Sequence, residues 1–321
     1  MEVTAPPVTG LRRTRHALDR IGDRTLYVVT ALAGFLSVLV VAAIIWQVVK
    51  GSWPAIKQFG ISFVWNQTWN PVTSVFGARE YVLGTLITAF GAMLIAAPLS
   101  IAIGLFLSEL APPAIRGPIG SLVDMLAAVP SVVIGLWGIY VLIPFTFHDI
   151  EPWLHDWFGF TGIFGTPTTA GVFPAMLVLA IMATPITSSI CRELFINVPR
   201  ELEEAAIGLG ATRWEMVKGV VVPNVKGGVV AGIVLGLGRA LGEAIAVTQV
   251  IGNGTPLQLN IFKPGVTLAS NLANQYSGAV SNLQVSALIY LGLILLVITF
   301  LANLVAQRIV LRFELQRTGG N

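Results

Sequence analysis

The sequence predicts an all-α integral membrane protein with six transmembrane helices and both termini in the cytoplasm. Only 11% of its 321 residues are charged, against about 25% in a soluble globular protein. Its apolar residues form runs longer than a buried core helix needs, and its basic residues are concentrated in alternate connections between these runs. With a mean hydropathy of +0.80, such a chain cannot cover a water-facing surface.

The composition also excludes several functional classes. The net charge of +3 is small for a nucleic-acid-binding protein, which carries a clustered basic surface. The single cysteine, Cys191, cannot form an internal disulfide. The longest connection has about 35 residues, and segments under about 40 residues rarely fold alone, so we expect no appended soluble catalytic domain.

Stretches of about 20 apolar residues, the length that crosses roughly 30 Å of hydrocarbon, occur six times. The predicted spans are residues 26–49, 82–107, 119–145, 171–191, 227–251 and 285–307. The first follows a basic cytoplasmic tail, 1–25, and its apolar run exceeds the roughly 7 to 15 residues of a signal peptide, so we interpret it as an uncleaved anchor. The six-span domain is predicted over 26–311, with its core over 81–311, and a second cytoplasmic tail over 312–321.

The basic residues predict the orientation. With the N-terminus inside, the cytoplasmic segments hold 14 Lys and Arg residues and the outer segments hold 4. Because cytoplasmic segments are enriched in these residues, both termini are expected in the cytoplasm. One basic residue, Arg239, lies inside a span.

The first two outer connections are rich in aromatic residues. These are Trp53, Phe59, Phe63, Trp65 and Trp69 in the first and Trp153, Trp157, Phe158, Phe160 and Phe164 in the second. An interfacial aromatic belt and a docking surface for an extracytoplasmic partner are compatible interpretations. The second connection also holds the cluster His148, Asp149, Glu151, His155 and Asp156. Pro152 interrupts its helical spacing and zinc-type signatures are absent, so no metal site is predicted.

Spans two to four each contain a proline, at Pro98, Pro130 and Pro185. Proline removes a backbone donor and its ring clashes with the preceding turn, so we expect these spans to be kinked or interrupted. Asp124, near the inner end of the third span, is expected to be solvated or to cap a helix rather than to be buried.

The connection between the fourth and fifth spans has the pattern of two short helices separated by a glycine corner. Pro199 suits a first helical turn, and Gly210 is placed as a C-terminal cap. Thr212 with Glu215 three residues later forms a capping-box pattern that starts a second short helix. The sequence therefore predicts a hairpin on the inner membrane face, which we call the 199–223 hairpin.

Residues of this hairpin carry a family resemblance. The spacing Glu204-Ala205-Ala206, three residues, Gly210, nine residues, Val220, one residue, Val222-Pro223 resembles the E-A-A-x3-G-x9-I-x-L-P loop of ABC importer permeases, with valine replacing isoleucine and leucine. In that family the loop docks into a cleft of the ATP-hydrolysing subunit. The resemblance implies a type I ABC importer permease architecture and assigns Glu204, Ala205, Ala206 and Gly210 to ATPase coupling. Without a partner, the same segment would be an interfacial amphipathic hairpin.

The sequence contains no G-x-x-x-x-G-K-[ST] segment, the loop that cradles nucleotide phosphates in many ATPases. It also contains no G-x-S-x-G nucleophile elbow. We therefore expect a transport subunit rather than an enzyme, binding no cofactor itself, with ATP and Mg held by a partner ATPase.

The fifth span holds Arg239 near its middle and Glu243 one turn later. An arginine at a helix centre costs about 2.5 to 3.5 kcal/mol on insertion scales, so its presence has to be compensated. On one continuous helix, both residues share an arc of about 80° with Gly228, Gly232 and Gly236, and such a glycine spine lets a neighbouring helix approach closely. The two residues then form either a structural ion pair in the protein interior or a polar site on a translocation path. In the second case the guanidinium binds an oxyanion such as phosphate, or a carboxylate.

Three segments are similar to phosphate permeases of the PstC type. They are G-L-G-R-A-L-G-E-A-I-A-V at 236–247, A-A-V-P-S-V-V-I-G-L-W-G at 127–138 and A-P-L-S-I-A-I-G-L-F-L-S-E-L at 97–110. In that family the arginine and glutamate of this helix are implicated in phosphate passage, and they map onto Arg239 and Glu243. The resemblance implies ATP-driven import of inorganic phosphate by alternating access across the bacterial plasma (inner) membrane.

The resemblance also implies partners. They are a second permease subunit of the PstA type, an ABC ATPase dimer of the PstB type and an extracytoplasmic phosphate-binding protein of the PstS type, all working in a lipid bilayer. Two other functions stay open. One is a permease of similar build for sulfate or another oxyanion. The other is a proton-coupled secondary carrier with Glu243 as its proton site, although such a carrier has no need of an E-A-A loop.

Overall fold

The computed structural model of the chain describes the backbone of residues 9–318 and the side chains of residues 22–311. Over that range the chain consists of helices, helical turns and loops, with isolated bridge pairs and no β-strand. The predicted all-α class is confirmed. Of the predicted tails, residues 1–8 and 319–321 lie outside the described residues, and the first helix already begins at Thr9.

Thirteen α-helices follow one another along the described chain. They are α1 (Thr9–Phe59), α2 (Arg79–Leu105), α3 (Pro113–Ala127), α4 (Ser131–Trp137), α5 (Ile143–Phe145), α6 (Glu151–Phe158), α7 (Val172–Ile196), α8 (Arg200–Gly208), α9 (Arg213–Met216), α10 (Val222–Gly242), α11 (Ile245–Val250), α12 (Leu268–Gln275) and α13 (Asn282–Thr318). Wider π-helical turns at Phe106–Leu110, Gly138–Leu142, Thr146–Ile150 and Val217–Val221 extend or join several of them, and 3-10 turns lie at Gly60–Val64 and Gly159–Thr161.

Six helical stretches are long and apolar enough to cross a membrane, as predicted. They are Gly22–Val64, Arg79–Leu110, Ser131–Thr161, Val172–Ile196, Arg213–Gly242 and Asn282–Leu311. Each predicted span overlaps one of these stretches. The chain is therefore a multi-pass membrane protein built on six transmembrane helices.

The bounds of the third span, predicted as 119–145, are wrong. Helix α3 ends at Ala127, and the next continuous helical stretch is Ser131–Thr161. Pro130 has an extended ψ of 137°, so the helix is interrupted there, whereas α2 and α7 continue through Pro98 and Pro185. Beyond residue 145, π-helical turns prolong the helix into the predicted outer connection.

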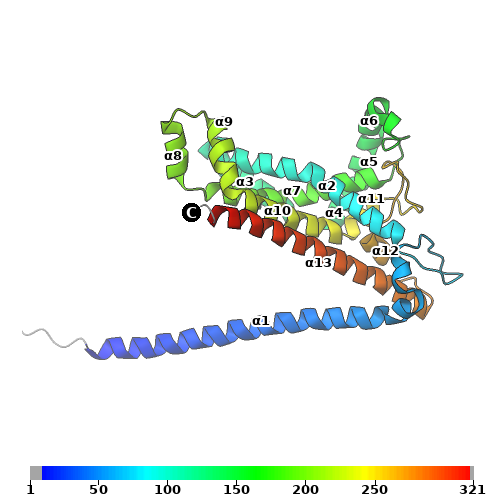
Figure 1. Cartoon of the computed structure of the whole chain (residues 1–321), viewed down its shortest axis with the longest axis horizontal. Coiled ribbons are helices and arrows are strands. Elements are labelled where there is room, and N and C mark those ends of the chain that lie inside the picture. Colours follow the sequence, from blue (N-terminus) through cyan, green and yellow to red (C-terminus); the bar gives the residue numbers. More distant parts are fainter. Residues whose placement is uncertain (1–8, 319–321) are drawn as a thin grey trace, which may run out of the picture. The chain divides into compact units, whose positions relative to one another are not determined.

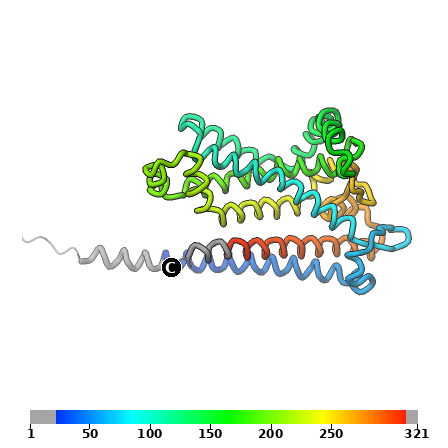
Figure 2. The backbone as a smooth tube through the Cα atoms, turned by 45° about the horizontal axis from the view of Figure 1, so that its top comes forward, coloured from blue at the N-terminus to red at the C-terminus, as the bar shows by residue number. Residues whose placement is uncertain are grey.

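Contacts divide the chain into two compact units, Met1–Gly51 and Ser52–Asn321. In the first unit, the side chains of α1 are exposed from Gly22 to Gln47, including Leu26 at 65% and Trp46 at 70%. A helix that is apolar all round has to be surrounded by lipid or by another protein. In the second unit, α2, α7, α10 and α13 lie along one another (Figures 1 and 2).

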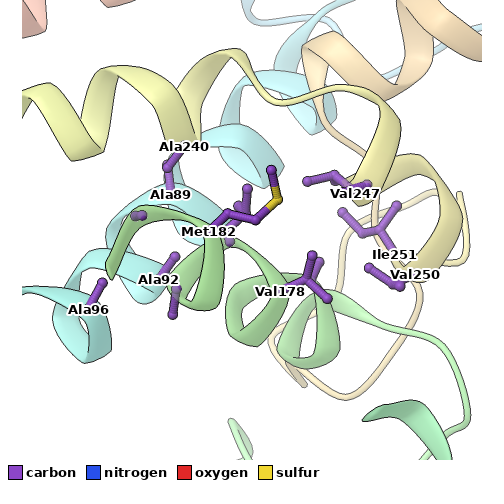
Figure 3. Close-up of a cluster of buried hydrophobic side chains, with 14 of the residues drawn as sticks. Ala89, Ala92, Ala96, Val178, Met182, Ala240, Val247, Val250 and Ile251 are labelled. Atoms are coloured by element: carbon purple, nitrogen blue, oxygen red, sulfur yellow. The ribbon is translucent and has the colours of Figure 1, made fainter. Parts of the chain in front are cut away.

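The core of the second unit forms where small residues let helices approach closely. Ala89, Ala92 and Ala96 line one side of α2 and are buried together with Val178 and Met182 of α7, as Figure 3 shows. Helix α10 joins the same core further along the chain. The packed pair of α2 and α7 therefore provides the frame against which α10 lies.

The end of this unit opposite the hairpin carries the loop between α11 and α12 (Figure 1). Glu80 is buried at the start of α2, and its Oε2 accepts a hydrogen bond from the backbone N–H of Leu257 at 2.6 Å. Thr85 Oγ1 accepts another from the N–H of Leu268 at 2.9 Å. These two hydrogen bonds fix the loop to α2, which belongs to the packed pair of α2 and α7.

Candidate functional site

The first half of the 199–223 hairpin has the predicted geometry. Helix α8 begins directly after Pro199. At its end the N–H of Ala211 donates to the carbonyl of Ala206 at 3.1 Å. Gly210 follows the helix with φ at 88°, in the left-handed region that favours glycine. The predicted glycine corner is confirmed.

The second half begins as predicted and then differs. Thr212 Oγ1 accepts the N–H of Glu215 at 3.3 Å, and the Glu215 carboxylate accepts the N–H of Thr212 at 2.8 Å, which completes the capping box. The second helix is not separate, however, because the π-helical turn Val217–Val221 joins α9 to α10. Pro223 is the second residue of α10, directly after this π-helical turn. The hairpin is thus a direct extension of α10.

The hairpin has a packed side and an open side. Met216, Val217 and Val221 are buried in one cluster with Phe195 and Cys191 of α7. The open side exposes apolar residues: Leu202 at 45%, Ile207 at 50%, Leu209 at 90% and Trp214 at 69%. Of the predicted coupling residues, Glu204, Ala205 and Gly210 are exposed and Ala206 is half-buried. An exposed apolar patch of this kind marks a surface that another molecule covers.

A charged groove of about 300 Å³ lies between α8 and the ends of α2, α3 and α7. It is lined by Ser108, Glu109, Arg116, Phe195, Ile196, Val198, Arg200, Glu203, Glu204 and Ile207. Burial raises the pKa of Glu203, and the neighbouring charge of Glu109 raises it further. No sequence pattern predicts that Glu109 and Arg116 lie beside the hairpin, because only the fold brings them there.

The glycine spine predicted for the fifth span is confirmed. A Cβ added at Gly228 would stand 2.8 Å from Leu194 of α7, and one added at Gly232 would stand 3.0 Å from Ile190. Arg239 does not lie in the interior with these glycines. Its side chain is exposed, so the prediction that this face buries the guanidinium within the chain is wrong.

The continuous helix assumed for the predicted span 227–251 is also wrong. Helix α10 ends at Gly242, Glu243 has an extended backbone with φ at −72° and ψ at 119°, and α11 starts at Ile245. Glu243 therefore does not share a helical face with Arg239. Its Oε1 accepts the N–H of Ala246 at 3.3 Å, which caps the first turn of α11.

Ion pairing does not account for Arg239. Among the described side chains, the ion pair formed is Arg192 with Asp124 at 3.0 Å, and none joins Arg239 to Glu243. Asp124 is 46% exposed in that pair, in keeping with the expectation that it is not buried. The interpretation of Arg239 and Glu243 as a structural ion pair thus has no support from the geometry of this chain.

Polar atoms without partners lie on the elements next to the helix break. Thr187 Oγ1 on α7 and both Thr248 Oγ1 and Gln249 Oε1 on α11 are buried and form no hydrogen bond. Thr187 lies against α10, where a Cβ added at Gly236 would stand 2.5 Å from its Oγ1. Buried unpaired polar atoms are rare in proteins, and interrupted helices at membrane depth characteristically line substrate sites. These unpaired atoms, on the elements that flank the helix break, have the chemistry to bind water or a polar ligand.

Two residues of the outer cluster of histidines and acids, Glu151 and His155, make local contacts. Glu151 is fully buried and its Oε2 accepts the N–H of Thr168 at 3.1 Å. His155 Nδ1 lies 2.9 Å from the carbonyl oxygen of Phe164. Both contacts tie α6 to the following loop.

Comparison with known proteins gives a consistent result. The family model described as "Binding-protein-dependent transport system inner membrane component" matches residues 100–314. A relative from Pasteurella multocida, named phosphate transport system permease protein PstC, is 43% identical over 94% of this chain and 95% of its own length. Relatives of the same name are 39% identical in Mesorhizobium japonicum, over 99% of this chain and 100% of the relative, and 44% identical in Haemophilus influenzae, over 89% and 92%.

Solved structures of similar fold are bacterial ABC importers. A bacterial alginate ABC transporter, in complex with its alginate-bound periplasmic protein, aligns with a TM-score of 0.54 at 17% identity, over 86% of this chain and 95% of that chain. The inward-facing MetNI methionine ABC transporter aligns with a TM-score of 0.51 at 17% identity, over 77% and 99%. At this identity the likeness concerns the fold alone, which is that of a type I ABC importer permease.

Proposed function

This chain belongs to the family of binding-protein-dependent transport system inner membrane components, and on that premise we propose that it is the transmembrane permease subunit of an ATP-driven importer of inorganic phosphate. The substrate is inferred from the 39–44% identity, over 89–99% of this chain, to relatives named phosphate transport system permease protein PstC. The chain is a transport subunit and not an enzyme.

We propose that Arg239 and Glu243 belong to the phosphate path. Arg239 is exposed in the last turn of the apolar stretch Arg213–Gly242, and an arginine that faces hydrocarbon is unfavourable. A second permease subunit covering this face removes that cost and leaves the guanidinium at the boundary between two subunits. Its fork of five donors suits phosphate oxygens. Glu243, fixed at the helix break by its bond to Ala246, places a negative charge nearby that favours release of the anion.

We propose that the 199–223 hairpin couples this path to an ATPase. Its exposed side chains, Leu209 and Trp214 above all, need a covering partner. The small residues Ala205 and Ala206 let α8 approach that partner closely, beside Glu204 and the Gly210 corner. Because the helix runs unbroken from Arg213 to Gly242, a displacement of the hairpin moves the end of α10 that carries Arg239. When ATP-driven closure of the ATPases moves this helix, the path at Arg239 opens alternately to the two sides of the membrane.

The proposed setting is the bacterial plasma membrane, with both termini and the hairpin in the cytoplasm. The proposed partners are a second permease of the PstA type, an ATPase dimer of the PstB type and an extracytoplasmic phosphate-binding protein of the PstS type. ATP and Mg are bound by the ATPase, and this chain binds no cofactor. We propose for this subunit the predicted division into two tails, 1–25 and 312–321, and a six-span domain over 26–311 with its core over 81–311 and the coupling hairpin over 199–223.

Reconstitution tests the function. The complex of this chain with its three partners is placed in proteoliposomes with ATP and radiolabelled phosphate, and Arg239→Gln is compared with wild type. Glutamine keeps hydrogen-bonding capacity but removes the charge, so we expect phosphate uptake to be lost while the subunits still assemble. Lys50→Gln, which neutralises an exposed cation outside the proposed path, is the matched control and should transport normally. Normal uptake by Arg239→Gln would remove Arg239 from the path, and ATP-dependent uptake of radiolabelled sulfate but not of radiolabelled phosphate by the wild-type complex would change the substrate.

A further inference from the structure

Helix α13 carries two carboxamide side chains, Asn303 and Gln307, one turn apart in the half of its span nearer the hairpin. Both are exposed, and within the described part of the chain neither side chain has a hydrogen-bond partner. Two other polar residues of this helix have hydrogen-bond partners within a few residues. Gln284 accepts the N–H of Val280 at 3.1 Å, and Thr299 donates to the carbonyl of Leu295 at 2.9 Å. The carboxamides of Asn303 and Gln307 therefore form no hydrogen bond that stabilises the described part of the chain.

Both amides line a groove of about 440 Å³ between α10 and α13. The other lining residues are apolar: Ala231, Val234, Leu235, Ala306, Val310 and Leu311. The two helices lie along one another in Figures 1 and 2. Lipid hydrocarbon cannot form hydrogen bonds with a carboxamide. This groove therefore has to hold water, a polar ligand or polar groups of another chain.

One residue of the groove lining, Asn303, stands opposite the residue that precedes Arg239 on α10. Asn303 stands opposite Gly238, because a Cβ added at Gly238 would lie 4.0 Å from its Oδ1, and Arg239 is the next residue of α10. From there, Ala231 on α10 and Val310 on α13 line the same groove, so the two helices are antiparallel and the groove extends toward the hairpin. An anion leaving the guanidinium in that direction meets Asn303 first and Gln307 one turn later.

We propose that Asn303 and Gln307 form a second stage of the anion path, between Arg239 and the hairpin end of the bundle, and that this stage selects a protonated oxyanion. The inference rests on the proposed function and names residues beyond it. A carboxamide has two N–H donors and a carbonyl acceptor. The donors bind oxyanion oxygens, and the acceptor takes the P–OH proton of phosphate, which fully deprotonated sulfate lacks. Because the amides are neutral, they hold the anion more weakly than Arg239 does and allow it to leave.

The test uses the complete importer complex in proteoliposomes with radiolabelled inorganic phosphate. The double variant Asn303→Leu/Gln307→Leu keeps the side-chain size and removes all the amide donors and acceptors. Losing one or two hydrogen bonds to an anion lowers a rate about tenfold to hundredfold, so we expect phosphate uptake to fall by that factor. Leu301→Ala, at an exposed position of the same helix outside the groove lining, is the matched control and should transport as wild type does.

A second measurement separates a path from an assembly interface. Cys191, the single native cysteine, is fully buried, so Asn303→Cys and Gln307→Cys can be labelled in the native background with a small charged thiol reagent. We expect saturating phosphate to slow labelling of both positions several-fold, and sulfate at the same concentration to leave it unchanged.

Each outcome decides the inference. Wild-type uptake by the double variant overturns it while leaving the proposed function intact, provided that Arg239→Gln still abolishes uptake. Loss of the second permease subunit from the purified double variant also overturns it, because the groove is then a contact between subunits. Equal protection by phosphate and sulfate overturns the selection of a protonated oxyanion. Absence of phosphate uptake by the wild-type complex overturns the proposed function itself.

Discussion

Glu243 combines a capping bond with a negative charge, and the two can be separated by mutation. Its Oε1 accepts the N–H of Ala246, a bond that an amide oxygen can also accept. Glu243→Gln therefore keeps the cap of α11 and removes only the charge. We expect this variant to fold and assemble normally but to import phosphate more slowly, because release from Arg239 loses the nearby carboxylate.

Glu243→Ala is the comparison for that prediction. It removes the acceptor as well as the charge, and loss of one intramolecular hydrogen bond destabilises a protein by about 1 kcal/mol. We expect it to slow uptake and also to lower the Tm of the purified complex, which Glu243→Gln leaves unchanged. If Glu243→Gln imports phosphate at the wild-type rate, the residue is a helix cap and has no part in transport.

At the scale of elements, the end of α8 depends on one glycine. Gly210 has φ at 88°, a conformation that costs an L-residue such as alanine about 1 to 2 kcal/mol. In Gly210→Ala we expect the last turn of α8 to rearrange, so that ATP hydrolysis by the complex continues with less phosphate transported per ATP. The measurement is the ratio of phosphate uptake to ATP hydrolysis in proteoliposomes.

Asparagine provides the matched control at this corner, because it adopts the left-handed conformation more readily than other non-glycine residues. Gly210→Asn should retain most of the transport-to-hydrolysis ratio that Gly210→Ala loses. Nothing lies within 4 Å of a Cβ added at this position, so the two variants differ in backbone preference rather than in crowding. A normal ratio in Gly210→Ala would show that the corner has no role in coupling.

Local signals explain which elements the sequence predicted. The hairpin was predictable because Pro199, Gly210 and the Thr212 capping box act within a few residues of themselves. The six spans were predictable because a bilayer requires long apolar runs. These signals fix the number and kind of elements but not their interruptions.

The helix breaks and the groove residues depend on contacts between distant segments. Gly242 is a weak helix-stop signal, because glycine also recurs inside α10 at Gly228, Gly232, Gly236 and Gly238, no proline follows, and the run remains apolar around Glu243. The break forms where Glu243 turns to cap α11 and α11 packs against α4. In the same way, Asn303 faces the residue before Arg239 only because α13 packs antiparallel to α10. No spacing within one segment encodes either arrangement.

At the scale of the whole molecule, one continuous helical stretch links two sites of different chemistry. Arg213–Gly242 carries the open apolar surface near Trp214 at one end and Arg239 toward the other. The glycine spine allows α10 to lie closely against α7 without bulky side chains between them, and interfaces of this kind permit small sliding motions. A docking event at the hairpin is therefore positioned to change access to Arg239.

The orientation of the whole molecule leads to the last prediction, which two highly exposed residues at opposite ends of the second unit can test. Leu209 in the hairpin is 90% exposed, and Val280, in the loop before α13, is 96% exposed. Basic residues gather at the hairpin end, and cytoplasmic segments are enriched in them. A membrane-impermeant maleimide applied to intact cells should therefore label Val280→Cys and leave Leu209→Cys unlabelled, when the chain is expressed without its ATPase so that nothing covers the hairpin. Permeabilised cells should label both, and the wild-type chain neither, because Cys191 is fully buried. Labelling of Leu209→Cys alone in intact cells would invert the topology, and the hairpin would then face away from any cytoplasmic ATPase.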